Sequence, residues 1–517
     1  LNDRLTINVG VRYEFESGLK AKDNAVIVGF DRGTVSPIAV TDPTANISPR
    51  GGVMFAGQNG YPTQTGNLNS NKISPRIGVA WKVNNKTTIR GGYGLFWAPV
   101  AYGLQTPLGW RAETPLTGSS DNGATPGDRL DNPFPNGLLS PVMSGNGLLT
   151  GVGGGLSFID QNMKAPYVHQ YSFDIQRELG WGVALAVGYV GSHGQNLTIG
   201  NAVNINQLEE RYFNDPSIGQ SVTNPYYDPN GQGFIRNATM TRAQLLRPFS
   251  QYGNLTTSLN SYGRSTYDSV VIKAQKRMSK GLSFLSTFTW SQFMDTGVGA
   301  AGSGPLNSLS ASTRNSYDIE REFSLSGSHT PRRWSNAVTY ELPFGKGKPF
   351  LDSALADLVV GGWSINAVQI WQTGFPLSVR QNVNTNANFF TLVQFPNATG
   401  VSPETSGRPQ DRIGLDAGST RFIDAAAFSN APTGTFGNVS RTLSMRGPGT
   451  HNWDISLFKT FTFLEKYKAQ FRAEAINAFN TPLFNSPNTT YGSGAFGQIS
   501  QQANFPRMYQ LGLRFFF

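Results

Sequence analysis

The sequence contains no cysteine among its 517 residues and only four histidines. Without cysteine, disulfide frameworks, zinc–thiolate sites, iron–sulfur clusters and cysteine nucleophiles are excluded, and four histidines argue against an all-histidine metal centre. We therefore expect no cofactor and no metal. Charged residues are also scarce, at 14%, against about 25% in ordinary soluble domains. The formal net charge is +10, but no run of five basic residues occurs, so we expect no nucleic-acid partner.

Long apolar runs are missing as well. No stretch of about 18 apolar residues could form a membrane-spanning helix, and the most apolar segment, 358–371, is interrupted by Ser364, Asn366 and Gln369. The chain starts at Leu1 without a signal-peptide core, so we expect a processed or truncated chain. Aromatic residues, by contrast, are abundant, with 34 Phe, 18 Tyr and 9 Trp.

The dominant pattern is an alternation of apolar and polar residues with a period of two. Between Leu5 and Phe15 the odd positions are apolar, whereas the even positions are polar or glycine. Successive side chains of a strand point to opposite faces, so this pattern predicts a strand with one apolar face. It recurs at 73–83, 453–463 and 467–477. Helical periodicity is confined to a short segment, 351–360. The sequence predicts a mainly β protein.

Twelve strands are predicted, joined alternately by short turns and long loops. The turns lie at 84–85, 180–181, 279–280 and 464–465, with 344–361 as a longer connection on the same side. The strands are 4–15, 73–83, 86–97, 167–178, 182–192, 266–278, 281–294, 333–343, 362–375, 452–462, 466–479 and 506–517, and the long loops are 16–72, 98–166, 193–265, 295–332, 376–451 and 480–505. Short–long alternation is typical of outer-membrane barrels, although soluble sandwiches and propellers also have alternating strands.

Three observations favour the membrane interpretation. Strands of 11–14 residues exceed the roughly 5–6 of soluble sheets and match the roughly 9–11 that cross a bilayer at a tilt. Aromatic residues recur near both ends of strands, as in Trp453 and Phe463, which is typical of interfacial girdles. Six long loops on one side hold most of the remaining residues. We therefore predict an all-β, antiparallel transmembrane β-barrel in the bacterial outer membrane, with membrane lipid as its surroundings.

The C-terminal strand carries a further signal. Its odd positions from Tyr509 to Phe517 are apolar and the chain ends on phenylalanine. The spacing of Gln510, Gly512, Phe515 and Phe517 resembles the β-signal that the barrel-assembly machinery reads, so this machinery is an expected partner. If Phe517 ends in the periplasm, counting back twelve strands places Leu1 there too, and every long loop lies outside the cell.

An ordered set of segments resembles one family. The segments are 5–14 (LTINVGVRYE), 90–96 (RGGYGLF), 188–194 (GYVGSHG), 340–348 (YELPFGKGK), 446–449 (RGPG) and 477–482 (NAFNTP). In this order they resemble Oar-like TonB-dependent receptors. The resemblance implies a barrel of about 22 strands whose lumen is filled by an N-terminal plug. Residues 1–517 match only the C-terminal barrel portion, without plug or upstream strands, so contact with the TonB complex is expected through a plug that this sequence lacks.

Charged residues at the polar positions of the strands are the candidates for the barrel lumen. Either they simply keep a wet lumen polar, which we favour for any single residue, or they contact a plug or line a substrate path. The lumen-facing candidates are Arg12, Glu14, Arg76, Arg90, Asp174, Lys468, Arg472, Glu474 and Arg514. In the loops, Tyr102 and Trp110 are candidates for stacking on a ligand, whereas Trp97 fits an interfacial girdle better.

Motifs of catalysis are absent. The glycine-rich segment 151–155 lacks the flanking strand and helix of a dinucleotide site, and 345–348 lacks the spacing of a phosphate loop. Ser192 and His193 are adjacent on a strand and point to opposite faces, so they cannot form a nucleophile pair. Residues 228–231 fit a turn better than a calcium loop. We therefore expect no enzymatic activity.

The interpretation that follows is an outer-membrane receptor that takes up a large or scarce solute, energised through TonB. Two alternatives stay open at this stage. One is a surface-display or adhesion barrel without transport, and the other, less favoured, is a complete 12-strand barrel hydrolase. Sequence upstream of Leu1 would discriminate among the three, because a plug with a TonB box identifies the transporter.

Overall fold

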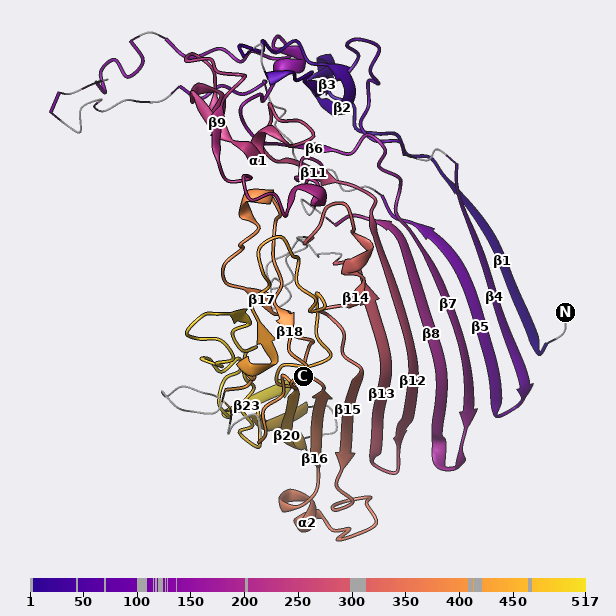
Figure 1. Cartoon of the computed structure of the whole chain (residues 1–517). Coiled ribbons are helices and arrows are strands. Elements are labelled where there is room, and N and C mark those ends of the chain that lie inside the picture. Colours follow the sequence, from indigo (N-terminus) through magenta and orange to yellow (C-terminus); the bar gives the residue numbers. More distant parts are fainter. Residues whose placement is uncertain are drawn as a thin grey trace.

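Twelve long strands form one antiparallel sheet in the computed structural model (Figure 1), which describes residues 3–42, 45–68, 71–99, 109–114, 116, 119, 124–125, 127, 129–135, 137–199, 203–297, 313–407, 412, 421–463 and 467–517. The strands are β1 (Leu5–Glu14), β4 (Lys72–Asn84), β5 (Thr87–Trp97), β7 (Tyr167–Glu178), β8 (Val183–Leu197), β12 (Gly263–Ser279), β13 (Leu282–Asp295), β15 (Arg332–Glu341), β16 (Trp363–Gln372), β20 (Thr450–Phe463), β21 (Tyr467–Ile476) and β23 (Met508–Phe516). All twelve predicted strands and the all-β fold class are confirmed.

The order of the strands in the sheet follows the order of the chain. Each long strand from β4 to β21 pairs with the long strand before it and the one after it, as expected where short turns and loops join antiparallel neighbours. The two-residue strand β14 (Ser324–Leu325) adds to the loop end of β13. The largest difference from the predicted boundaries is at β8 and β12, which extend to Leu197 and from Gly263, so the loop predicted at 193–265 is shorter.

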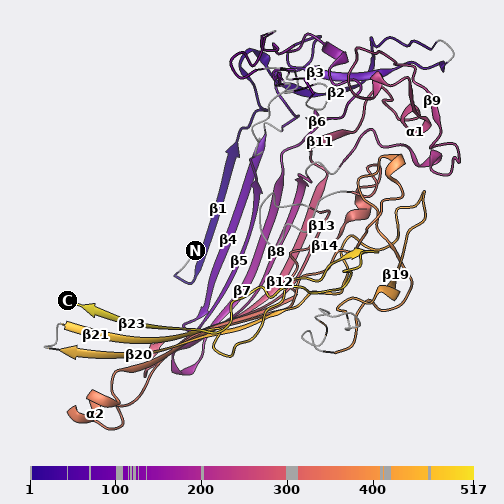
Figure 2. The ribbon, with the colours of Figure 1, turned by 90° about the vertical axis from the view of Figure 1, so that its left-hand side faces the viewer.

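The sheet is curved but open (Figure 2). Among the described residues, β1 pairs only with β4 and β23 only with β21, and the two edge strands lie apart. The first residue of β1, Leu5, is opposite Trp81, close to the turn between β4 and β5, and Phe516 is opposite Lys468 at the start of β21. Both ends of the chain therefore lie at the short-turn end of the sheet, as the strand count predicts.

The long connections contain structure that the sequence pattern does not predict. They carry a short helix, α1 (Arg242–Leu245), single 3-10 turns, and five two-stranded sheets. The pairs are β2 (Ile27–Val35) with β3 (Arg50–Phe55), β6 (Leu156–Ile159) with β11 (Leu255–Leu259), β9 (Ser221–Thr223) with β10 (Thr239–Thr241), β17 (Arg380–Gln381) with β22 (Thr490–Tyr491), and β18 (Asn397–Ala398) with β19 (Phe428–Ser429). Figure 1 shows α1 and the labelled strands β2, β3, β6, β9 and β11 gathered beyond one end of the long strands.

Except for Ala469 in β21, the buried apolar residues of the described chain belong to these loops and not to the long strands. One cluster joins Phe30, Phe158, Phe249 and Tyr252, whose rings pack at centroid distances of 5.0–5.8 Å. A second cluster contains Leu377, Val379 and other residues between 422 and 499. Because burial of such side chains stabilises by about 1.5–3 kcal/mol each, the loops hold a fixed shape of their own.

At the opposite end of the sheet, the connection between β15 and β16 carries the helix α2 (Ala354–Val359), within the segment 351–360 predicted to be helical. Ser353 begins the helix, because its Oγ accepts a hydrogen bond from the N–H of Ala356 at 3.1 Å. In the described part of the chain, no helix has the length and apolar character needed to cross a membrane.

Candidate functional site

The two faces of the sheet differ in chemistry. Residues opposite one another in adjacent strands share a face, so the register can be followed from β1 to β23. From Ile7 through Val79, Gly91 and Phe173, one face remains mostly apolar and aromatic across the sheet as far as Leu511 and Leu513. We call this the apolar face, and the other the polar face. Apolar-face side chains are widely exposed, Val9 for example at 74%.

The nine charged residues proposed from the sequence as lumen-facing all lie on the polar face. Following the register, Arg76 shares a face with Gly10 and Gly94, Arg90 lies opposite Asp174, and Arg514 lies opposite Gln470. They fall into three groups along the sheet: Arg12, Glu14 and Arg76 on β1 and β4; Arg90 and Asp174 on β5 and β7; and Lys468, Arg472, Glu474 and Arg514 on β21 and β23.

At the loop end of β1 and β4 the charges are partnered locally. Arg12 Nε lies 2.5 Å from Glu14 Oε1, and the buried Lys72 is paired with Glu16. The guanidinium of Arg76 lies 4.7 Å from the ring centroid of Phe96, a cation–π geometry. The Phe96 ring lies over Gly94, where a Cβ would come within 2.7 Å of it. All of these residues except Gly94 line a hollow of about 640 Å³.

The group at the other edge of the sheet is arranged similarly. Arg472 Nε donates a hydrogen bond to Gln470 Oε1 at 2.8 Å, and its guanidinium lies 4.6 Å from the Phe458 ring. Glu474 lies opposite Gln510 in the register. Exposed pairs and stacks of this kind contribute little to stability, so their main effect is to keep this face wettable.

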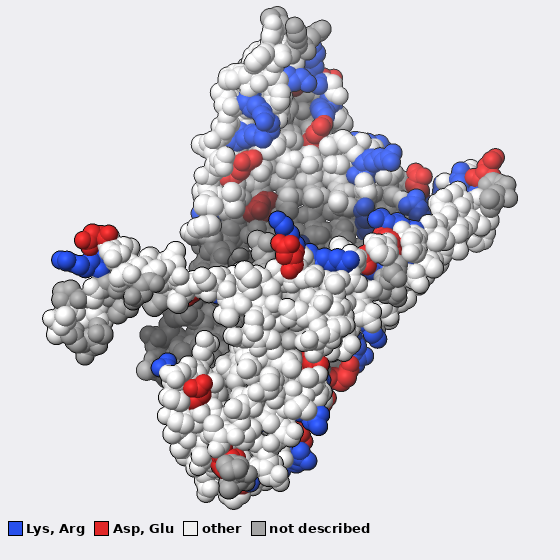
Figure 3. Space-filling model, turned by 90° about the horizontal axis from the view of Figure 1, so that it is seen from above, with Lys and Arg blue, Asp and Glu red and all other residues white. Residues whose placement is uncertain are grey.

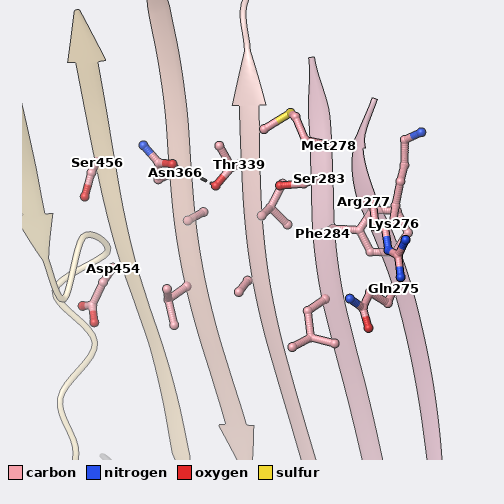
Figure 4. Close-up of a pocket in the computed structure, with 15 residues that line it drawn as sticks. Gln275, Lys276, Arg277, Met278, Ser283, Phe284, Thr339, Asn366, Asp454 and Ser456 are labelled. Carbon is pink, nitrogen blue, oxygen red and sulfur yellow. Dashed lines mark hydrogen bonds between the residues drawn. The ribbon is translucent and has the colours of Figure 1, made fainter. Parts of the chain in front are cut away.

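Between these groups lies a hollow of about 520 Å³ on the polar face, formed by the short-turn half of β12, β13, β15, β16 and β20 (Figure 4). One row of register partners crosses it from Ser283 through Thr339 and Asn366 to Ser456. A second row supplies Gln275, Leu285, Ala337, Val368 and Asp454. This site could not be predicted from the sequence, because its residues become neighbours only through the register of five strands.

Hydroxyl and amide groups line this hollow together with the charged side chains of Lys276, Arg277 and Asp454. Thr339 Oγ1 donates to Asn366 Oδ1 at 2.9 Å, and the Nδ2 atom of Asn366 is buried without a hydrogen-bond partner among the described residues. Asp454 Oδ1 accepts hydrogen bonds from Asn452 Nδ2 at 3.0 Å and from the backbone N–H of Asn477 at 2.9 Å. An unsatisfied buried amide costs roughly 1–3 kcal/mol. The hollow therefore offers hydrogen bonds to a polar group that enters it.

Two buried ion pairs fix the loops, one within the connection after β13 and one between a loop and the end of β13. Arg314 Nε lies 2.9 Å from Glu322 Oε1, and Arg441 Nη2 lies 2.5 Å from Asp295 Oδ1 at the end of β13. Burial lowers the pKa of Arg441, while the carboxylates of Asp295 and Glu322 oppose that shift. Removing one partner of such a pair leaves an uncompensated buried charge, which costs about 3–5 kcal/mol. These pairs hold the loops over β13 and β14 in one arrangement.

The aromatic residues proposed for ligand stacking have different positions. Tyr102 lies outside the described residues. Trp110 is half-buried and packs edge-on against Phe55, at a centroid distance of 5.3 Å, beside the loop cluster of Phe30. Trp97 lies at the loop end of the apolar face, where its Nε1 donates to the carbonyl of Ile73 at 3.1 Å and its ring packs on Tyr167. This position fits an interfacial girdle.

Ser192 and His193 lie on opposite faces, as the sequence predicts. His193 is on the apolar face, where its Nε2 lies 3.0 Å from the hydroxyl of Tyr171. The hydroxyls of Tyr171 and Tyr189 donate to Asp268 Oδ1 at 3.3 and 2.5 Å. In the part of the chain that the structure describes, no group of three or more His, Asp or Glu residues is arranged to hold a metal ion.

The four residues of the proposed assembly signal lie on the edge strand β23 or directly after it. Gln510 and Gly512 are on the polar face, opposite Glu474 and Arg472, and Phe515 is on the apolar face, opposite Ala469. Phe515 and Phe517 are both largely exposed. The free edge of β23 thus presents unpaired backbone groups together with two aromatic side chains.

Viewed from above, the charged side chains gather in separate groups with broad uncharged surface between them (Figure 3). A sheet with one continuous exposed apolar face, polar residues on the other face, aromatic residues near both strand ends and long loops at one end has the properties of a membrane barrel wall. A soluble sheet would bury such an apolar face.

Comparison with known protein families also assigns the chain to the outer membrane. The family model described as "Outer membrane beta barrel domain" matches residues 1–510. No curated protein sequence matches the chain. Among solved structures, the outer membrane transporter YddB from Escherichia coli is similar over 86% of this chain and 40% of its own, at 11% identity and a TM-score of 0.39.

Two further structures are similar at the same level. The siderophore receptor PiuA from Acinetobacter baumannii is 8% identical over 90% of this chain and 38% of its own, with a TM-score of 0.37. The pyoverdine outer membrane receptor FpvA from Pseudomonas aeruginosa is 10% identical over the same shares, with a TM-score of 0.38. The chain thus spans about two fifths of the length of the solved proteins that it matches.

Proposed function

Because the chain belongs to the outer membrane β-barrel family and resides in the bacterial outer membrane, we propose that it is the C-terminal barrel portion of an Oar-like TonB-dependent receptor. In this proposal the apolar face contacts lipid and the polar face lines the lumen. The receptor binds a large or scarce solute with its extracellular loops and takes it up with energy supplied through TonB. The chain's own residues perform no bond chemistry.

The observation that carries this proposal is the pair of open edges, β1 and β23. In hydrocarbon, each unpaired backbone N–H or C=O costs several kcal/mol, so a sheet edge exposed to lipid is not viable. The two edges lie apart in the structure. In the proposed receptor, further strands of the same protein pair with β1 and β23 and close a barrel of about 22 strands, wide enough to enclose a plug domain.

The polar face supports a role in transport through its chemistry. The hollow of Figure 4 combines hydroxyl, amide and carboxylate groups with an apolar floor, and its unpartnered Asn366 amide is available to a hydrogen-bond acceptor. A plug seated in the lumen supplies backbone carbonyls of this kind. The plug itself, its TonB box and the contact with the TonB complex are parts of this proposal that lie outside residues 1–517.

A cross-linking experiment in the full-length protein tests the proposal. Cysteines replace Ile7 in β1 and, one at a time, Leu511, Leu513 or Phe515 in β23, in a cysteine-free background and in native membranes. Two cysteines form a disulfide only when their Cα atoms are within about 7 Å. We expect no cross-link, because additional strands separate β1 from β23. The control pair, Val9→Cys with Ile77→Cys, joins register partners and must cross-link.

Efficient cross-linking between β1 and β23 would mean a complete 12-strand barrel and would contradict the receptor proposal. The adhesion alternative would then gain support, because the loops contain apolar cores of their own. Uptake is tested separately by growth on limiting solutes. Cells that lack this protein and cells that lack TonB should fail on the same solute, whereas an adhesion protein would affect neither growth nor uptake.

A further inference from the structure

The connection between β15 and β16, residues 342–362, exposes an apolar surface at the short-turn end of the sheet. Helix α2 presents Leu355, Leu358 and Val359 on one side, since residues three and four apart share a helix face. Leu355 is 83% exposed, and Phe350 and Leu351 just before the helix are more than half exposed. A contiguous apolar patch on a surface indicates contact with a partner or a membrane.

Two side chains of the apolar face hold the C-terminal end of α2. Trp363 and Lys459 are register partners on β16 and β20. Trp363 Nε1 donates to the carbonyl of Val359 at 2.8 Å. Lys459 is almost completely buried, and its Nζ donates to the carbonyls of Asp357, at 3.0 Å, and Gly361. Because a helix leaves its last carbonyls unpaired and negatively polarised, a lysine there is favourable. The helix is therefore attached on the apolar-face side of the sheet.

The preceding turn is fixed by its own acidic residues. Asp357 Oδ1 accepts a hydrogen bond from the N–H of Lys346 at 2.9 Å, and Asp352 Oδ1 accepts one from the N–H of Gly347 at 2.8 Å. Lys348 is paired with Glu341 at 2.9 Å. The carboxylates of this segment are thus engaged in internal contacts, while Lys346 and the apolar residues remain on the outside.

The apolar patch adjoins the apolar face of the sheet. Between α2 and the strand ends lies a hollow of about 610 Å³ lined by Phe344, Leu358, Trp363, Phe461 and Phe463 among others. Of these, Trp363, Phe461 and Phe463 belong to the apolar face. Leu358 of the patch and Trp363 of the apolar face line this one hollow, together with polar side chains such as Lys346, Asp357 and Thr460. The same surroundings therefore contact both surfaces.

We propose that residues 342–362 form an interfacial anchor in which α2 lies in the phospholipid leaflet on the short-turn side of the outer membrane. Its occupant is lipid: acyl chains around Leu355, Leu358 and Val359, and a headgroup phosphate near Lys346. Such helices place their apolar side roughly 5–10 Å into the boundary between headgroups and acyl chains. This inference depends only on the outer-membrane location and is independent of whether the protein transports a solute.

Depth-dependent fluorescence quenching tests the anchor. Leu355→Cys and Leu358→Cys variants of the full-length, otherwise cysteine-free protein are labelled with a polarity-sensitive dye and reconstituted in phospholipid vesicles. Bromine atoms on the acyl chains quench a dye in the leaflet, whereas iodide quenches a dye in water. We expect bromolipid quenching and loss of iodide quenching at both positions. Lys280→Cys, in the exposed turn between β12 and β13, is the matched control and should show the reverse.

Two outcomes would overturn the anchor. Iodide quenching at Leu355 equal to that at Lys280 would mean that α2 lies in water. Shielding of Leu355 in native outer membranes but not in pure phospholipid vesicles would mean that a partner protein covers the patch instead of lipid. Neither outcome changes the β1–β23 cross-linking result, so failure of the anchor and failure of the receptor proposal are distinguishable.

Discussion

The ring of Tyr171 lies directly over Gly191, its register partner on the neighbouring strand. A Cβ at Gly191 would overlap the ring, so only glycine permits this packing. The arrangement lets the Tyr171 hydroxyl reach His193 and Asp268. Glycine is unfavourable within a strand, but Gly191 leaves the space that allows side chains of β7, β8 and β12 to form hydrogen bonds with one another.

Gly191→Ala should therefore destabilise the barrel by about 1–3 kcal/mol, the usual cost of overpacking. The measurement is the free energy of unfolding in urea for the full-length protein in detergent or lipid. Gly78→Ala is the control, because a Cβ at Gly78 meets no atom within 4 Å. Equal stability of the two variants would show that the tyrosine can move aside at no cost.

The assignment of the faces predicts a strong asymmetry between two adjacent residues of β1. Val9 is on the apolar face and Asn8 on the polar face. Val9→Arg places a charge in lipid and should cost about 2–4 kcal/mol near the membrane midplane, whereas Asn8→Arg should be tolerated. Unfolding free energies of the two variants in lipid vesicles check this. Similar costs at both positions would contradict the assignment of the apolar face to lipid.

Topology can be read by protease treatment of intact cells. The connections within 98–166, 193–265 and 376–451 should lie outside the cell, and exposed residues such as Leu130 and Leu138 mark where cleavage is easiest. The turns at 84–85 and 464–465 should be protected. Fragments produced by cleavage at those turns alone, in cells with intact membranes, would reverse the orientation.

Mild acid should loosen the loops that contact the end of β13. His329 Nδ1 accepts a hydrogen bond from the N–H of Phe293 at 3.3 Å. Burial, and then the nearby charge of Arg446, lower the pKa of His329 from its ordinary 6.5 to about 4. A neutral His329 is therefore required in the folded state, and the unfolded state binds the proton more readily between these values. Stability is complete above pH 6.5 and falls as the pH drops towards 4.

The loss should reach about 1–2 kcal/mol near the lower limit. Hydrogen exchange of residues 324–331 at pH 7.5 and pH 4.5 measures it. His329→Gln removes the titration and should reduce the difference between the two pH values. An unchanged difference in this variant would assign the acid sensitivity to other groups.

The strands of the sheet could be predicted from the sequence because each of them encodes its own geometry. In β1 the alternation of apolar residues with polar residues or glycine is complete, and in β21 it is broken only at Ile476. The grouping of Arg12, Glu14 and Arg76 on one face follows from the same parity. The alternation with a period of two thus predicts both the strands and the chemistry of each face of the sheet.

The loops could not be predicted in the same way. The strand pair β6–β11 joins residues about one hundred positions apart. Apart from β2, the loop strands have six residues or fewer, which is too short to show a period. The hollow of Figure 4 was missed for another reason. Thr339, Asn366 and Ser456 become neighbours only through the register between strands, which alternation alone leaves undetermined.

The long strands lie in the sheet in the same order as in the chain, and this order determines how the barrel wall can be assembled. Every long strand from β4 to β21 pairs with the long strands just before and just after it in the chain, so a hairpin is the smallest unit that satisfies most of its backbone hydrogen bonds. Each added hairpin removes the exposed edge left by the previous one and creates a new edge one step further along. The strands of this sheet can therefore insert in one direction along the chain, one hairpin at a time. Between β1 and β23, no strand needs a partner that is distant in the order of the long strands.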